Sequence, residues 1–167
     1  MRSFLPLTDY KKEDIIDVCG YLQNWADAVI VRHKNNDMLE KMANTMTIPV
    51  INAMTDDNHP CEIMSDLYSL SKNRRDYLCD EYLFVGGDGN IGRAWKEASE
   101  AFGFSLTQSA PLAYQISGLD CNVDLQTAIE GKDIICTDCP YGVILCYCEI
   151  FPLFFPLSAL VKHYGTI

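Results

Sequence analysis

Short apolar runs alternate with longer segments of helical periodicity, and this alternation limits the fold more than any other feature of the chain. Runs rich in β-branched or aromatic residues predict strands over 28–31, 49–52, 82–85, 104–107 and 133–137. The segments between them repeat apolar residues at helical spacing, as at Leu39, Met42 and Met46. Strand–helix–strand units of this kind connect parallel strands. The sequence therefore predicts an α/β fold, with parallel sheets flanked by helices.

Several residues predict where individual helices begin and end. Pro60 is typical of the first turn of a helix, and Gly103 is typical of a helix end. A short helix over 123–130 is expected to begin after Asn122 as its N-cap and to stop at Gly131. The polar, unpatterned segment 71–76 is the best candidate for a boundary between two halves of the chain.

The charge balance and the cysteines limit the partners and the compartment. The 167 residues include 13 Lys and Arg against 23 Asp and Glu, which gives a net charge of −10. Such a chain repels phosphate backbones, so no nucleic-acid partner is expected, although a few local groups can still bind a small anion. There are eight cysteines and no apolar leader segment in residues 1–10. Reduced thiols and a cytoplasmic location are therefore expected.

Polar side chains follow the predicted strands where each strand ends, and ligands of open α/β sheets bind at that edge. Arg32 and His33 follow the first strand, the polar segment 55–62 follows the second, and Asp138 follows the last. An Arg and a His from neighbouring strands can converge on an anion. The helix that starts at Pro60 would add backbone N–H groups to the same anion. A solvated strand end and a turn residue are the simpler interpretations of Arg32 and His59 taken singly.

Several of these segments together resemble the aspartate/ornithine carbamoyltransferase family. The matching segments are 26–33, 48–53, 59–62 (His-Pro-Cys-Glu), 66–68, 82–90 and 133–138. The resemblance extends over residues 13–138, about three-quarters of the chain. It implies that residues 1–71 are the C-terminal half of a carbamoyl-phosphate-binding domain. It also implies that residues 77–140 are the N-terminal half of an amino-acid-binding domain, followed by an atypical apolar tail over 141–167.

The resemblance also implies a reaction and the residues that perform it. The family transfers a carbamoyl group from carbamoyl phosphate to an acceptor amine, such as the amino acid ornithine. By position, Arg32 would bind the phosphate and carbonyl oxygens, and His59 would donate a hydrogen bond to the carbonyl oxygen. Glu62 stands where the family has Gln and would contact the carbamoyl NH₂, while Asn90 and Asp138 would bind the acceptor. No metal or organic cofactor is implied, and family members are typically trimers.

The chain also departs from the family pattern. The Ser-x-Arg-Thr-Arg phosphate loop is absent from this sequence, and Ile91 stands where ornithine enzymes carry a second Asn. Gly142 and Val143 replace the expected Ser-Met pair. Independent turnover is therefore not expected of this short chain. An inactive fragment that acts only by association stays open as an alternative.

Other patterns indicate other chemistry. The G-x-G-x-x-G pattern over 87–92 lies between a strand and a helix and keeps an NAD(P)-binding oxidoreductase open as an alternative. The pairs Cys136/Cys139 and Cys146/Cys148 suggest zinc, although buried thiols explain them better. A nucleophilic pair of Cys61 with His59 lacks a group to orient the His. Residues 141–161 hold 16 apolar residues in 21, which leaves membrane contact of this tail open.

Overall fold

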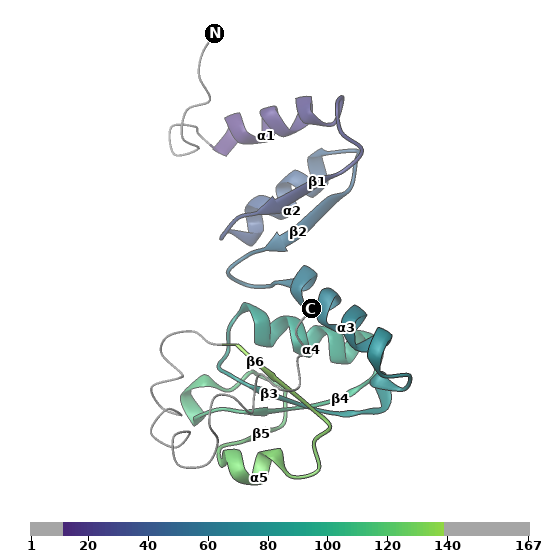
Figure 1. Cartoon of the computed structure of the whole chain (residues 1–167). Helices are drawn as coiled ribbons and strands as arrows, with labels where there is room; N and C mark the ends of the chain where they lie inside the picture. Colours follow the sequence, from purple (N-terminus) through teal and green to yellow (C-terminus); the bar gives the residue numbers. More distant parts are fainter. Residues whose placement is uncertain (1–11, 139–167) are drawn as a thin grey trace. The chain divides into compact units, whose positions relative to one another are not determined.

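The computed structural model describes residues 12–138 (Figure 1). Those residues form two compact units: residues 12–79 with 89–103, and residues 80–88 with 104–138. The first unit contains α1 (Lys12–Leu22), β1 (Val29–Arg32), α2 (Asn36–Thr45), β2 (Val50–Met54), α3 (Pro60–Asn73), the 3₁₀ turn Tyr77–Cys79 and α4 (Asn90–Phe102). The second contains β3 (Glu81–Val85), β4 (Ser105–Ser109), the 3₁₀ turn Leu112–Tyr114, β5 (Cys121–Asn122), α5 (Leu125–Ile129) and β6 (Ile134–Thr137).

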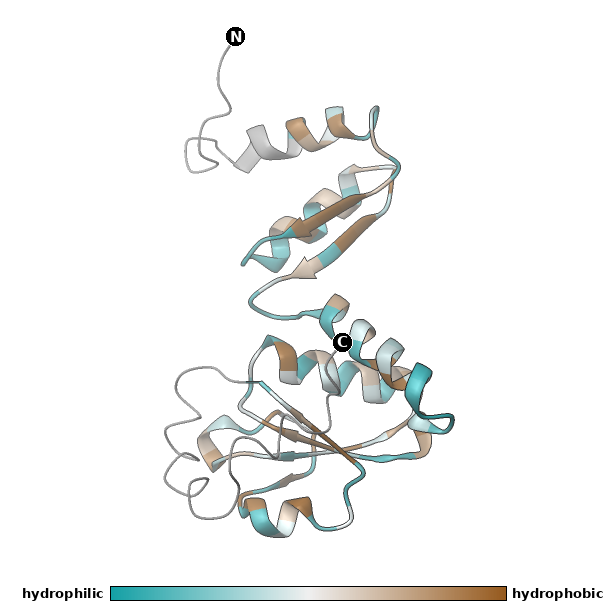
Figure 2. Ribbon diagram, viewed as in Figure 1, coloured by the Kyte–Doolittle hydropathy of each residue, from teal (hydrophilic) through white to brown (hydrophobic). Residues whose placement is uncertain are grey.

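In the first unit, β1 and β2 form a two-stranded parallel sheet that is covered on one face. The buried core on that face consists of Cys19, Met38, Met42 and Met46, which come from α1, α2 and the end of α2. On the other face, Ile30 is 71% exposed and its register partner Ile51 is 39% exposed. The hydropathy colours show both strands as largely apolar (Figure 2). The apolar run 28–31 thus lies largely in a strand, as predicted, but alternate residues of β1 are exposed because only one face is covered.

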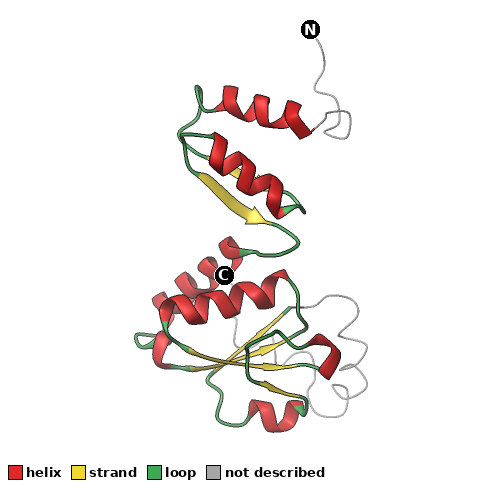
Figure 3. Cartoon of the chain, turned by 180° about the vertical axis from the view of Figure 1, so that it is seen from behind, coloured by secondary structure: helices red, strands yellow, loops and turns green. Residues whose placement is uncertain are grey.

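In the second unit, four parallel strands form one sheet in the order β5-β4-β3-β6 (Figure 3). Strand β3 pairs with β4 on one side and with β6 on the other. Its three middle residues, Tyr82, Leu83 and Phe84, are completely buried. The Tyr82 ring also packs against Phe104, with the ring centroids 4.5 Å apart. This parallel sheet with flanking helices agrees with the predicted fold class.

Two of the predicted helix ends are confirmed and one is wrong. Pro60 is the first residue of α3, and Gly103 ends α4 with φ +76°, a left-handed conformation that favours glycine. Asn122, predicted as the N-cap of the short helix, instead lies in β5. Asp124 caps α5, because its carboxylate accepts the hydrogen bond of the Thr127 amide at 3.2 Å. Asp124 suits this role better than Asn122, because it lies after the strand and its carboxylate reaches the first turn of α5.

The remaining sequence expectations fall partly outside the described residues. Within residues 12–138, no helix is long and apolar enough to cross a membrane. The apolar segment 141–161 lies outside this range, as do Cys139, Cys146 and Cys148. Over the same described range, no group of three or more His, Cys, Asp or Glu side chains could hold a metal ion. Its five cysteines are free thiols.

Candidate functional site

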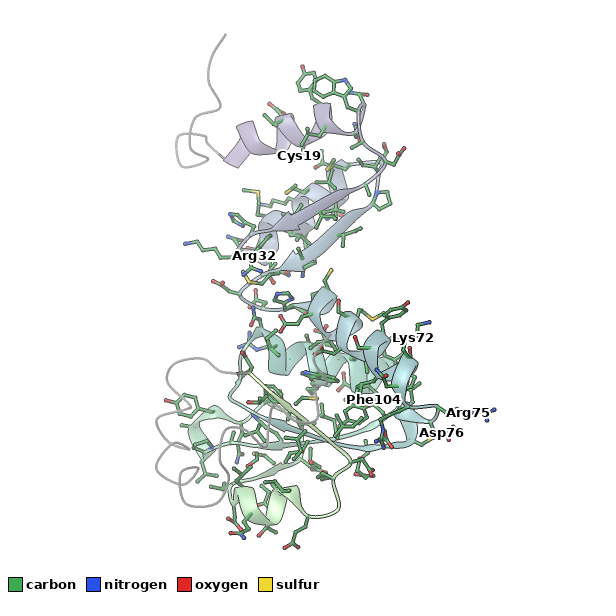
Figure 4. All side chains as sticks on the ribbon, in the orientation of Figure 1. Cys19, Arg32, Lys72, Arg75, Asp76 and Phe104 are labelled. Carbon is green, nitrogen blue, oxygen red and sulfur yellow. The ribbon has the colours of Figure 1, made fainter. Side chains whose placement is uncertain are left out.

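The carboxyl ends of β1 and β2 are joined by hydrogen bonds between the loops that follow them. The His33 amide donates to the carbonyl of Met54 at 3.0 Å, and the Asp56 amide donates to the carbonyl of Lys34 at 3.0 Å. The register shifts between Val31 and Arg32, at the last residue of β1. The Arg32 side chain is exposed at this strand end (Figure 4). Arg32, which is predicted to bind an anion, therefore lies at the same edge of the sheet as the polar loop that follows β2.

A buried turn connects β2 to α3 and determines where His59 lies. Thr55 is completely buried, and its amide donates to the carbonyl of Asn58 at 2.8 Å. The Thr55 hydroxyl oxygen accepts from the amides of Asn58 at 3.0 Å and Asp57 at 3.3 Å. His59 follows this turn directly as the N-cap residue of α3, and its side chain makes no capping bond. The ring is thereby left available for other contacts.

The ring of His59 makes one contact and leaves one nitrogen without a partner. Nε2 lies 3.2 Å from Oε2 of Glu62, one turn along α3. Nδ1 is buried and has no hydrogen-bond partner among the described residues. A carboxylate only accepts, so Glu62 places the proton on Nε2, and Nδ1 of the neutral ring is then an acceptor. Two residues that the resemblance assigns to the carbamoyl group are thus in direct contact.

Two side-chain oxygens on the strand and the turn before His59 are also buried without a partner among the described residues. These atoms are Oδ1 of Asn52, on β2, and Oδ1 of Asn58, in the turn. The carboxylate of Glu97 determines which way the Asn58 side-chain amide points, because only the amide nitrogen Nδ2 can donate to it. An unsatisfied buried polar atom costs about 1–3 kcal/mol and requires an explanation, of which a ligand is one. Neither Asn carries a predicted role, and only their positions, at the end of a predicted strand and in the polar segment after it, could have indicated one.

The neighbours of the site include a further carboxylate and a thiol. Burial raises the pKa of the Asp66 carboxyl, and the Glu62 carboxylate four residues earlier on α3 raises it further. The Cys61 thiol donates to the backbone carbonyl of Asn52 at 3.1 Å. It is therefore engaged with the backbone, and the geometry does not favour a nucleophilic pair of Cys61 with His59.

The two residues predicted to bind the acceptor lie in different surroundings. The Asn90 side chain, at the start of α4, donates to the backbone carbonyl of Thr55 at 2.7 Å. Asp138 follows β6 in the second unit and is partly buried there. The structure therefore brings His59 and Glu62 together and connects Asn90 to the turn before them. The roles of all five predicted residues, including Arg32 and Asp138, stay predictions.

The glycine-rich turn after β3 does not favour the dinucleotide alternative. The Asp88 amide donates to the carbonyl of Tyr114 at 2.9 Å, and the Gly86 amide donates to that of Ser109 at 3.3 Å. A Cβ atom at Gly86 would lie 2.7 Å from the Phe84 ring, so close packing explains this glycine. Strand β4 ends at Ser109 and is followed by Ala110, where an acidic residue would be needed for the ribose. Two backbone amides of this turn are therefore engaged by other backbone groups, and the acid that a dinucleotide requires does not follow β4.

Comparisons of the sequence identify related proteins. Residues 5–72 match the family model for the aspartate/ornithine carbamoyltransferase, carbamoyl-P binding domain. The chain is 28% identical over 139 residues to an ornithine carbamoyltransferase of Geobacter sulfurreducens, covering 75% of this chain and 46% of that protein. An ornithine carbamoyltransferase of Bradyrhizobium diazoefficiens is 31% identical over 138 residues, at 75% and 45% coverage. The chain thus spans about half the length of the curated relatives it matches.

Solved structures agree in fold. Ornithine carbamoyltransferase from Burkholderia thailandensis superimposes with a TM-score of 0.74 and 21% identity, covering 87% of this chain and 52% of that one. The enzyme from Pyrococcus furiosus gives 0.73 and 22% identity, at 89% and 54% coverage. The family assignment rests on the family match over residues 5–72, on these relatives and on the parallel sheets. The chain therefore belongs to the aspartate/ornithine carbamoyltransferase family and covers part of its fold.

Proposed function

We propose that the first unit binds carbamoyl phosphate and that the chain's chemistry is carbamoyl transfer to an acceptor amine. The observation that carries the proposal is the set of buried, unpartnered polar atoms on β2, the turn and the start of α3. Two of them, His59 Nδ1 and Asn58 Oδ1, are adjacent in sequence and lie within the family-matched segment. A ligand that donates hydrogen bonds would satisfy them, because an amide oxygen and the unprotonated Nδ1 are acceptors. Carbamoyl phosphate has an NH₂ group and meets this requirement.

The phosphate would be bound at the ends of β1 and α3. Arg32 is exposed and makes no ion pair with any described residue, so its guanidinium is free to bind two phosphate oxygens. The first turn of α3, a helix of 14 residues, presents unsatisfied backbone N–H groups and the positive end of its dipole. These groups offset part of the charge repulsion expected from an acidic chain.

The reaction begins when the lone pair of the acceptor amine attacks the carbamoyl carbon. Charge develops on the carbonyl oxygen, and a hydrogen bond from His59 would stabilise it. The bond from carbon to the phosphate oxygen then breaks, phosphate leaves with the electron pair, and the amine loses a proton.

Ornithine and related amines are the acceptors to test, since the relatives are ornithine carbamoyltransferases. Assembly as a homo-oligomer and a cytoplasmic location also stay predictions.

Glu62 determines how well His59 can serve in this reaction. Its Oε2 atom lies 3.2 Å from Nε2, so a proton on Nε2 faces Glu62 and not a substrate. Donation to the carbonyl oxygen therefore requires either a protonated ring, which donates from Nδ1, or release of Nε2 by Glu62. The negative charge of Glu62 also opposes an incoming phosphate. We expect Glu62 to weaken carbamoyl phosphate binding relative to the Gln of the family.

Isothermal titration of carbamoyl phosphate into the purified chain tests the proposal. Loss of a charge-assisted hydrogen bond of about 1.5–3 kcal/mol predicts that Arg32→Ala weakens binding roughly 10- to 100-fold. Glu62→Gln should strengthen binding. Lys34→Ala is the matched control, because Lys34 is an exposed cation two residues beyond Arg32. A folded wild-type chain without saturable binding, or equal losses in the Arg32 and Lys34 variants, would contradict the proposal.

A further inference from the structure

We infer that α4 sets the geometry of the His59 site, with Asn90 as a positioning residue that acts through the Thr55–Asn58 turn. This inference rests on the proposed function and deepens it. It also gives Asn90 a different role from the acceptor contact that the family resemblance implies. The observations that carry it are the hydrogen bonds between one face of α4 and the turn.

Three side chains on one face of α4 each contact a different residue of the Thr55–Asn58 turn. Asn90 Nδ2 donates to the Thr55 carbonyl at 2.7 Å. Arg93 lies 3.5 Å from the Asp57 carboxylate, and Glu97 accepts from the Asn58 side chain. Positions 90, 93 and 97 are separated by three and four residues, which places them on one face of a helix. The contacts join segments that are 35 to 39 residues apart in sequence.

The Asn90 contact is the one that reaches a buried backbone group. Thr55 is completely buried, and its amide and hydroxyl are already engaged within the turn. Asn90 supplies the donor for its carbonyl at 2.7 Å. Without that donor, the carbonyl stays buried and unsatisfied, or the turn shifts to reach water. Because His59 directly follows the Thr55–Asn58 turn, such a shift moves the ring relative to Arg32.

The Glu97 contact determines which atom of Asn58 is left for a ligand. The carboxylate can only accept, so the amide nitrogen of Asn58 points to it and Oδ1 lies on the other side. That oxygen is the buried, unpartnered atom next to His59. The Arg93 contact has both side chains substantially exposed, at 39% and 62%, and ranks below the other two. Thus α4 places the turn through Asn90 and orients Asn58 through Glu97.

Nuclear magnetic resonance of the histidine rings in the ligand-free chain tests the inference. The chain has three histidines, His33, His59 and His163, so the ring ¹⁵N signals can be assigned by single substitutions. We expect Asn90→Ala to shift the His59 ring signals and leave those of His33 unchanged. Asn90→Gln keeps the amide donor and should restore them in part. Asn24→Ala is the matched control, since Asn24 also donates to a backbone carbonyl, that of Tyr21 at 3.2 Å.

A second measurement separates positioning from direct contact with the acceptor. We expect Asn90→Ala to weaken carbamoyl phosphate binding about 3- to 10-fold, the equivalent of one net hydrogen bond. Unchanged His59 signals in a folded Asn90→Ala chain would overturn the inference, as would lost amine binding with unchanged carbamoyl phosphate affinity. If Asn90→Ala does not fold, Asn90→Asp, which removes the donor with little change of shape, provides the same ring readout. Because the ring signals need no ligand, a wild-type chain that fails to bind carbamoyl phosphate contradicts the proposed function alone.

Discussion

Strands β1 and β3 have similar apolar sequences and very different surroundings. The sequence of β1 is Val-Ile-Val-Arg and that of β3 is Glu-Tyr-Leu-Phe-Val. The three middle residues of β3 are completely buried, whereas Ile30 in β1 is 71% exposed. Among the strands of residues 12–138, β3 pairs with a strand on each side, and β1 pairs only with β2. An apolar run therefore predicts that a strand forms, while the neighbours present in the chain decide how much of it is buried.

The side chains that form the cores beside these two strands also differ. The core behind β1 and β2 contains three methionines and one cysteine. The core around β3 contains aromatic rings and the buried side chain of Gln108, which is hydrogen-bonded at both ends. Methionine adapts to irregular space and specifies packing less well than rings and branched chains do. The sheet of β1 and β2, from which the proposed site extends, thus packs on the more adaptable set of side chains.

The largest expected effect separates the two strands directly. Leu83→Ala removes a completely buried side chain and should lower the free energy of unfolding by about 2–5 kcal/mol. Ile30→Ala is the matched control, and its exposed side chain predicts a change within about 0.5 kcal/mol. Urea unfolding of both variants measures the difference. Similar losses in the two variants would mean that the outer face of β1 is covered in solution.

The buried amide of Gln108 gives the next effect. Its Nε2 donates to the carbonyls of Gly86 at 2.8 Å and Tyr114 at 3.1 Å, and its Oε1 accepts from the Ile116 amide at 2.8 Å. Gln108→Leu removes the partner of the Gly86 carbonyl and of the Ile116 amide, so unfolding should become easier by about 1–3 kcal/mol. Gln126→Leu, at an exposed position of α5, should change stability little when measured in the same urea series. Equal effects at the two positions would contradict the role given to the amide.

The N-cap of α2 gives a smaller effect in the first unit. Asn35 Oδ1 accepts from the Met38 amide at 3.1 Å, which satisfies one free donor of the helix. Asn35→Ala should therefore lower stability by about 1 kcal/mol. The neighbouring exposed Asn36 bonds Glu40 within the helix, and Asn36→Ala should cost only a few tenths of a kcal/mol. If the thermal midpoints of the two variants coincide, the capping bond does not contribute as proposed.

The smallest expected effect depends on pH. The pKa of Asp66 is raised above its ordinary value of 3.8 by burial first and by Glu62 second, so its ionised form is disfavoured in the folded chain. The resulting destabilisation is present above the folded pKa and disappears as the pH falls below 3.8. Asp66→Asn should thus stabilise the chain at pH 7 by about 0.2–0.5 kcal/mol, the size of a like-charge pair four residues apart on a helix. Urea unfolding at neutral and acidic pH measures it, and a gain that persists at acidic pH would show another cause.

Local sequence signals predicted much of the fold and the general position of the site. Pro60 and Gly103 act through their own backbone preferences, and Arg32 and His59 follow their strands directly. Asn122 was misassigned because β5 has only two residues, too few to show a period. The bond from Asn90 to Thr55 spans 35 residues and depends on how α4 packs, so no local pattern indicates it. The exposure of Ile30 could not be predicted either, because it depends on which strands surround β1.

One titration tests most directly whether the chemistry resides in the first unit. Carbamoyl phosphate is added to the ¹⁵N-labelled chain, and backbone amide shifts are followed in both units, with NAD⁺ as a parallel ligand. We predict saturable shifts at Arg32 and over 55–62, and unchanged amides in β3, β4 and β6. Saturable shifts over 86–92 with NAD⁺, or no saturable shift with carbamoyl phosphate in a folded chain, would contradict the account.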